Sequence, residues 1–208
     1  MIRNRFPTKT SLAINDLAPH LTSPRTTAPP IVRTRFCYHS PVATNNKNPP
    51  LLSEADAAFL QRRTSMTIAA RDAQNRPVVA RAFGCRVSSD RRRVTLFLGV
   101  EHSPLALECL RENGAIAVAI TRPTTHETLQ FKGQVLDISP LSDEDRAEMA
   151  AYQQSLVDEL APIGHRPEFV RSVLDAGSQD CVAVVFEPAQ LFNQTPGPKA
   201  GEKLGPRP

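Results

Sequence analysis

Six β-type segments, most of them joined by short turns, constrain the fold of this chain more than any other feature. They are residues 66–71, 78–88, 94–100, 115–121, 128–138 and 181–186. In the third segment Val94, Leu96 and Leu98 fall on alternate positions, which predicts a strand buried on at least one face. The fourth segment is apolar throughout and is typical of a central strand. A sheet is therefore the expected framework of the fold.

Four helices are expected around these strands, over residues 53–63, 103–113, 142–160 and 167–174. Ser53 and Ser142 each precede acidic residues, a pattern that predicts a helix start, because the hydroxyl caps the first amides and the acids favour the positive helix end. Ser103 followed by Pro104 predicts a third start, with the serine hydroxyl as the cap and the proline at the first helical position. Six strands, with helices after the third and the fifth, describe a mainly β fold, a closed or half-closed antiparallel barrel with added helices.

The two ends of the chain differ in composition from its middle. Of the 208 residues 19 are proline, and the prolines gather towards the ends. We expect residues 1–50 to form a disordered or targeting-like tail, because they show no sustained periodicity. Their Arg, Ser and Thr content also resembles an organellar transit peptide, and a start codon placed upstream of the true one is a further alternative. One folded domain is expected over residues 51–198, with a disordered tail over residues 199–208.

Charge and cysteine content argue against several classes of protein. The net charge is +4, but seven basic residues lie within the first fifty, so the folded part is close to neutral and nucleic-acid binding is not expected. The four cysteines are far apart, which predicts neither a metal site nor a disulfide framework, but the reduced thiols of a cytoplasmic protein. No apolar run approaches about eighteen residues, so no membrane helix is expected.

The hexad Arg81-Ala82-Phe83-Gly84-Cys85-Arg86 is the best candidate for a binding site. It places two guanidinium groups among apolar neighbours, and the planar guanidinium suits a phosphate. In a regular strand Arg81 and Arg86 would point to opposite faces, whereas a bulge at Gly84 would bring them together. The alternative is a structural role, with one arginine in solvent and the other in an ion pair.

Three further features are candidates for a ligand site. Thr128, Gln130, Lys132 and Gln134 form a polar stripe on one face of their strand, which faces either solvent or a cleft. His126, in the preceding loop, is a candidate acid, base or ligand contact, although a single loop histidine usually has none of these roles. The free amides of the helix that starts at Ser103 are a candidate anion site.

This organisation resembles the FMN-binding split-barrel family, which contains pyridoxamine 5′-phosphate oxidase. The resemblance covers roughly residues 52–198. It rests on the order of strands and helices and on three motifs, namely the hexad with a basic residue at each end, Leu96-Phe97-Leu98, and Leu129-Gln130-Phe131-Lys132-Gly133 with a glutamine before the family's glycine. The resemblance implies a six-stranded antiparallel split β-barrel that binds FMN.

The resemblance also implies roles for individual residues. Arg81 would contact the FMN phosphate or ribityl region, and Arg86 would lie near the flavin ring. Phe97 and Leu98 would supply backbone contacts along the cofactor. The helix start at Ser103 would lie near the phosphate. Family sites sit at a dimer interface, so Gln130 would reach the cofactor from the second subunit of a homodimer.

The chain departs from the family at two places. The family usually has a lysine or an arginine-lysine pair at the helix start, where this chain has Pro104 and Leu105, so His102 or Lys132 would have to compensate. The chain also has no tryptophan, and its C-terminal tail therefore lacks the tryptophan and arginine by which the true oxidase holds pyridoxal phosphate. We therefore expect an FMN-dependent oxidoreductase acting on another small substrate. The alternative is a flavin, deazaflavin or haem binding module without turnover.

Overall fold

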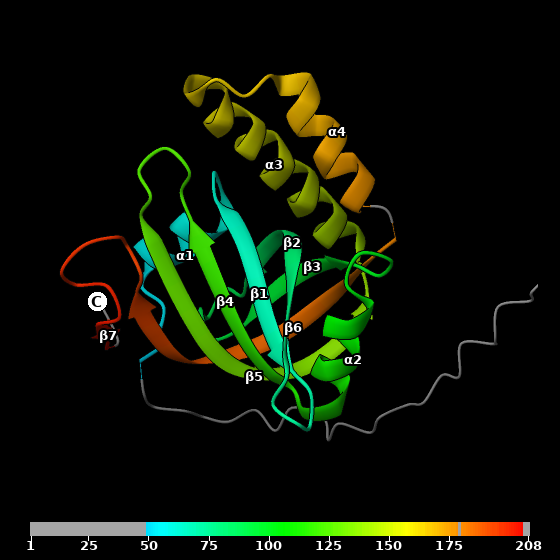
Figure 1. Ribbon diagram of the computed structural model, residues 1–208, viewed down its shortest axis with the longest axis vertical. Coiled ribbons are helices and arrows are strands. Elements are labelled where there is room, and N and C mark those ends of the chain that lie inside the picture. Colours follow the sequence, from blue (N-terminus) through cyan, green and yellow to red (C-terminus); the bar gives the residue numbers. More distant parts are fainter. Residues whose placement is uncertain (1–48, 179, 206–208) are drawn as a thin grey trace, which may run out of the picture. The chain divides into compact units, whose positions relative to one another are not determined.

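The computed structural model describes residues 49–178 and 180–205 (Figure 1). Of the tail expected over residues 1–50, all but the last two residues lie outside this range. No helix among the described residues is both long and apolar enough to cross a membrane.

Six antiparallel strands close into a barrel. They are β1 Ser65–Arg71, β2 Pro77–Val87, β3 Val94–Gly99, β4 Ala115–Thr121, β5 Thr128–Pro140 and β6 Cys181–Asn193. The strands follow the order β3-β2-β1-β4-β5-β6, and β3 pairs again with β6. This closure confirms the six-stranded antiparallel barrel expected from the sequence.

Alternate residues of each strand fill the barrel interior. Met66 and Ile68 of β1 are fully buried and stand opposite Ala82 and Ala80 of β2. Directly opposed residues of an antiparallel pair share a face, so these four side chains point inward. The residues between them, including Arg81, therefore lie on the outer face of the barrel.

Four α-helices surround the barrel. They are α1 Glu54–Gln61, α2 Pro104–Asn113, α3 Asp143–Leu160 and α4 Pro167–Ser178, and a 3-10 turn, η1 Ala161–Ile163, follows α3. Ser53 and Ser142 form capping boxes with Asp56 and Asp145, as their sequence pattern predicted. Helices α3 and α4 lie side by side over one part of the sheet (Figure 1), and both contact β2. They provide one wall of the candidate site.

A bulge in β2 sets the direction of both hexad arginines. The pairing of β2 with β3 shifts between Ala82 and Cys85, and Gly84 within the shift has a φ of 141°. Ala82 and Cys85 both face buried leucines of β3, so the extra residue changes which positions point outward. Arg81 and Arg86 consequently share the outer face. The predicted bulge is present, but only Arg81 lines the groove described below, whereas Arg86 pairs with carboxylates of α3.

The C-terminal segment is folded further than the sequence indicated. We expected disorder from residue 199, but β7 Lys203–Leu204 pairs with Leu191 and Phe192 of β6. A turn in which the amide of Ala200 donates to the carbonyl of Gly197 reverses the chain beforehand. The turn brings residues 203 and 204 to a free edge of β6, and their backbone groups gain partners there. The folded region therefore reaches Leu204 rather than Pro198.

Candidate ligand-binding groove

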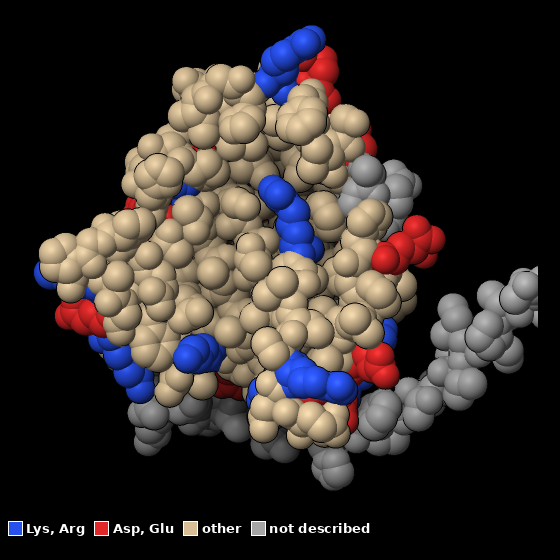
Figure 2. Space-filling view, viewed as in Figure 1, with Lys and Arg blue, Asp and Glu red and all other residues tan. Residues whose placement is uncertain are grey.

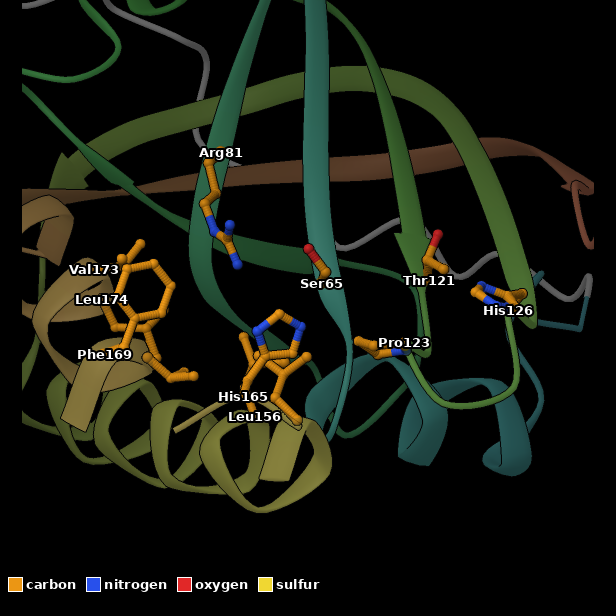
Figure 3. Close-up of a pocket in the computed structure, with 12 residues that line it drawn as sticks. Ser65, Arg81, Thr121, Pro123, His126, Leu156, His165, Phe169, Val173 and Leu174 are labelled. Carbon is orange, nitrogen blue, oxygen red and sulfur yellow. The ribbon is translucent and has the colours of Figure 1, made fainter. Parts of the chain in front are cut away.

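A cavity of about 450 Å³ lies between the outer face of the barrel and the helices α3 and α4 (Figure 3). We term it the α3–α4 groove. Its barrel side consists of Ser65, Arg81, Thr121, Pro123 and His126, and its helix side of Leu156, Leu160, His165, Phe169, Val170, Val173 and Leu174. The helix side is apolar except for His165, whereas the barrel side is mostly polar.

Arg81 enters this groove with its charge unpaired. Its side chain is exposed on the outer face of β2, and it makes no hydrogen bond or ion pair with another residue in the part of the chain that the structure describes. Figure 3 shows the Arg81 guanidinium and the His165 ring both pointing into the cavity. A guanidinium without an anionic partner beside an apolar wall is a ready contact for an anionic ligand.

Arg86 has the opposite environment. Its guanidinium lies 2.9 Å from the carboxylate of Asp145 and 3.7 Å from that of Glu144. Burial raises the pKa of Asp145, but hydrogen bonds from Ser142 and from Arg86 outweigh burial and leave that pKa below its ordinary value. Arg86 does not line the groove. The structural alternative is therefore met at both positions, with Arg86 in an ion pair and Arg81 exposed and unpaired among the described residues.

Helix α3 accounts for the difference between the two arginines. Its first turn holds Arg86, Tyr152 packs over Gly84, and Leu156 lines the groove with Arg81. A Cβ at Gly84 would lie 3.3 Å from the Tyr152 Cβ, so this close approach requires glycine. The buried Tyr152 hydroxyl donates to the Thr64 carbonyl, and burial raises the pKa of this phenol.

Phe97 and Leu98 do not line the groove. Both are fully buried, and their strand is paired with β2 on one side and β6 on the other. Phe97 lies on the outer face beneath α3, where it packs with Leu141 and Ala183. Their side chains are used for packing. The backbone of Leu98 pairs with both neighbouring strands, whereas that of Phe97 pairs with Ala183 of β6 and faces the bulge of β2.

Ser103 lies outside the groove but carries an unusual hydroxyl. It is only 3% exposed, and its Oγ has no hydrogen-bond partner among the described residues. Ser103 precedes α2 without capping it by its side chain. Leu105, where the family has a basic residue, is 63% exposed. The start of α2 thus offers a buried donor and free amides but no cation.

Gln130 and Lys132 lie on the same outer surface as Arg81, at a distance. Arg81, Thr67, Ala119 and Gln130 form one row across β2, β1, β4 and β5. Three strand spacings of about 4.8 Å separate its ends by roughly 14 Å. Within one chain Arg81 and Gln130 therefore cannot hold the same phosphate. The Lys132 ammonium lies 5.1 Å from the centre of the Phe192 ring.

The outer surface between these residues carries small side chains. We term it the sheet face; its central members are Thr67, Ala69, Ala117 and Ala119. A hollow of about 380 Å³ lies on it, lined in part by Ala69, Ala117 and Lys132. Figure 2 shows that charged side chains are sparse over this side of the molecule. A planar ligand or another protein surface can approach such a face closely.

The groove also contains residues that the sequence did not single out. His165 follows Pro162 and Gly164, which were interpreted only as helix breakers, and Phe169, Val170 and Val173 belong to an amphipathic helix whose apolar spacing was the available signal. Assigning them to a site requires knowing where α4 packs.

The β4–β5 loop carries His126 into the groove. The hydroxyl and amide of Thr124 donate to the buried carboxylate of Glu159 on α3, which ties the loop to the helix. The Arg122 guanidinium lies 5.3 Å from the centre of the Phe59 ring.

Among residues 49–178 and 180–205, no group of three or more His, Cys, Asp or Glu side chains is arranged to hold a metal ion.

Comparison with known proteins finds similarity only among solved structures. No family model and no curated protein matches the sequence. HupZ from group A Streptococcus is 15% identical with a TM-score of 0.44, covering 72% of this chain and 99% of its own. An F420 reductase is 18% identical with a TM-score of 0.43, covering 67% and 98%.

A pyridoxamine 5′-phosphate oxidase-related, FMN-binding protein from Nostoc punctiforme is 13% identical with a TM-score of 0.41. The match covers 76% of this chain and 98% of that protein. At these identities and TM-scores the similarities do not identify a ligand for this chain.

Proposed function

We propose that this protein is an FMN-binding oxidoreductase that works as a homodimer. The observation that carries the proposal is the unpaired Arg81 guanidinium, which borders both the α3–α4 groove and the sheet face. A free guanidinium favours a phosphate, because it donates two parallel charge-assisted hydrogen bonds. The phosphate of FMN would be held there.

The residues present fit a flavin nucleotide. FMN combines a dianionic phosphate, a polar ribityl chain and a flat aromatic ring. Arg81 would supply a cation for the phosphate, and the Ser103 hydroxyl, which has no hydrogen-bond partner among the described residues, would be a second donor. The small side chains of the sheet face leave room for a flat ring. Arg86, Phe97 and Leu98 have no part in this proposal, because their side chains are already used in the fold.

The sheet face supports the proposed homodimer. Gln130 lies too far from Arg81 to share a ligand with it, but a second copy packed on this face would bring its own Gln130 and Lys132 towards the cofactor. Small side chains permit close approach of two sheets, and few charges would be desolvated. The resemblance to the split-barrel family supports this arrangement.

Bound FMN would supply exchange of a hydride or an electron pair with a small substrate. The chain's own residues would bind and orient the partners. Arg81 would fix the anionic end of the cofactor, and the apolar residues of α3 and α4 would exclude water from the adjacent groove. Hydrolytic chemistry has no support, because neither hydroxyl of the groove lining, on Ser65 or on Thr121, is hydrogen-bonded to a histidine among the described residues, and Thr121 pairs with Thr128 instead.

A binding module without turnover is the second candidate function. This candidate is favoured by Leu105, an exposed apolar residue at the position where the split-barrel family has a basic one. A phosphate site that lacks one cation holds its cofactor less tightly. Such a module would bind flavin, a deazaflavin or haem for storage or sensing. Reduction of bound flavin by a nicotinamide, with reoxidation by a small acceptor, separates the oxidoreductase from the module.

Titration of the full-length protein with FMN tests the proposal. Saturable binding, one flavin per chain, should change the visible spectrum of the flavin and raise the melting temperature. At a free concentration 100 times the dissociation constant, the added stability is about 2.7 kcal/mol. A protein that neither alters the flavin spectrum nor melts at a higher temperature with FMN would contradict the proposal.

A further inference from the structure

The helix side of the α3–α4 groove is an apolar wall that is partly open. Leu156, Val170 and Leu174 are buried, but Phe169 and Val173 of α4 remain exposed, Val173 to 44%. An exposed aromatic ring at the edge of a cavity is costly to leave in water, and a ligand that covers it gains from burial of apolar surface. This wall therefore favours a ligand with an apolar, ring-sized body.

The polar groups of the groove carry positive charge or hydrogen-bond donors. Arg81 and His165 point into the cavity from opposite sides, and His126 lies beside Thr121 at another part of the lining (Figure 3). No hydrogen bond or ion pair joins the Arg81, His126 or His165 side chains to other described residues. No aspartate or glutamate is among the lining residues. The donor set is complementary to an anion.

The volume of the groove sets the size of the ligand. About 450 Å³ falls within the range of roughly 300–1,000 Å³ that is usual for small-molecule sites. A chain of lipid length or a peptide would exceed this space. A compound of one to three rings with one acidic group matches the volume, the apolar wall and the donors together.

We infer that the α3–α4 groove binds a small aromatic or otherwise apolar molecule that carries one carboxylate, sulfonate or phosphate group. His165 receives the anionic group, and Phe169 and Val173 cover the apolar body. This ligand class is the substrate class of the proposed flavoprotein, since Arg81 borders the sheet face where FMN is placed. The substrate assignment rests on the proposed function, whereas binding in the groove does not.

Binding of 8-anilinonaphthalene-1-sulfonate to the full-length protein tests the inference, because this dye is an aromatic anion of suitable size. Its fluorescence should report saturable binding of one dye per chain. Val173→Asp places a carboxylate on the apolar wall and should weaken binding about tenfold or more. Ile163→Asp is the matched control, because Ile163 is 48% exposed and does not line the groove. Equal binding by both variants would overturn the inference.

A neutral probe tests recognition of the anion. N-phenyl-1-naphthylamine has the same rings without the sulfonate. His165→Ala should weaken binding of the sulfonate dye by roughly tenfold and leave the affinity for the neutral dye unchanged. Only the sulfonate accepts the hydrogen bond that this variant removes. Arg166→Ala is the control for charge, since Arg166 is exposed and lies outside the groove lining. Equal losses for the two dyes in His165→Ala would contradict anion recognition.

Titration of the same proteins with FMN separates this inference from the proposed function. Val173→Asp should leave FMN affinity unchanged, in line with separate positions for substrate and cofactor. Saturable dye binding by a protein that does not bind FMN would refute the proposed function and leave the groove as a binding site. FMN binding without saturable dye binding would refute the inference alone. Stoichiometric displacement of FMN by the dye would overturn assignment of the groove to the substrate.

Discussion

The two arginines of the hexad show how the environment divides roles between identical side chains. Arg86 meets two carboxylates at the first turn of α3, whereas Arg81, five residues earlier, has no partner in the described part of the chain. A single strand residue, Gly84, places both on the outer face. Their side-chain chemistry alone would not have distinguished them, because the partner of Arg86 lies 59 residues further along the chain.

Asp145 gives a prediction for the pH dependence of stability. Its pKa is lowered in the folded protein, so its carboxylate stabilises the fold above the ordinary aspartate pKa of about 4, and this contribution is lost as the pH falls through the lowered value. The variant Asp145→Asn lacks this titration. Thermal unfolding should show the largest stability difference from the wild type near neutral pH and a smaller one at pH values below about 4. A constant difference over that range would contradict the assignment.

At the scale of elements, the sequence predicted more of the helices than of the groove between them. Ser53 and Ser142 located two helix starts because capping is a local interaction. The groove depends on how α3 and α4 pack on the outer face of β2, and no local pattern encodes that contact. His165 and Phe169 were therefore missed. Phe97, for which the resemblance implies a backbone contact to the cofactor, packs its side chain with Leu141 and Ala183.

The bulge in β2 gives a prediction for stability. Gly84 has a positive φ, and an added Cβ would lie 3.0 Å from a Phe97 ring carbon, so Gly84→Ala should destabilise the protein by about 2 kcal/mol through strain and overpacking. Gly164→Ala is the matched control, because its φ is also positive but nothing lies within 4 Å. That variant should lose only about 1 kcal/mol. Chemical denaturation measures both; equal losses would show that packing at Gly84 is unimportant.

At the scale of the whole molecule, strand alternation was enough to predict the closed barrel. Buried side chains recur at every second position of β1 and β4, and this period of two predicts strands of a sheet with one buried face. The end of the folded region was misjudged, because the pairing of Lys203 and Leu204 with β6 depends on a turn in a polar, proline-rich segment. The polar stripe with Gln130 was recognised, but its distance from Arg81 requires the order of the strands.

The proposed homodimer gives a prediction for the mass in solution. The chain has a mass of 22.8 kDa, so sedimentation velocity of the full-length protein should show a species of about twice that mass. Ala117→Glu places a charge in the middle of the sheet face and should shift the equilibrium to monomer. Arg111→Glu, on the exposed side of α2, should remain dimeric. A wild-type protein that stays monomeric at all concentrations would rule out this dimer.

The affinity for FMN of Arg81→Ala, compared with that of Arg86→Ala, tests the central claim most directly. Removing the unpaired guanidinium should weaken FMN binding by about 2 kcal/mol, roughly 30-fold, and leave the melting temperature of the free protein nearly unchanged. Arg86→Ala should leave FMN affinity unchanged and destabilise the fold by about 2 kcal/mol, because it leaves the buried Asp145 carboxylate without its partner. Unchanged FMN affinity in Arg81→Ala would contradict the account.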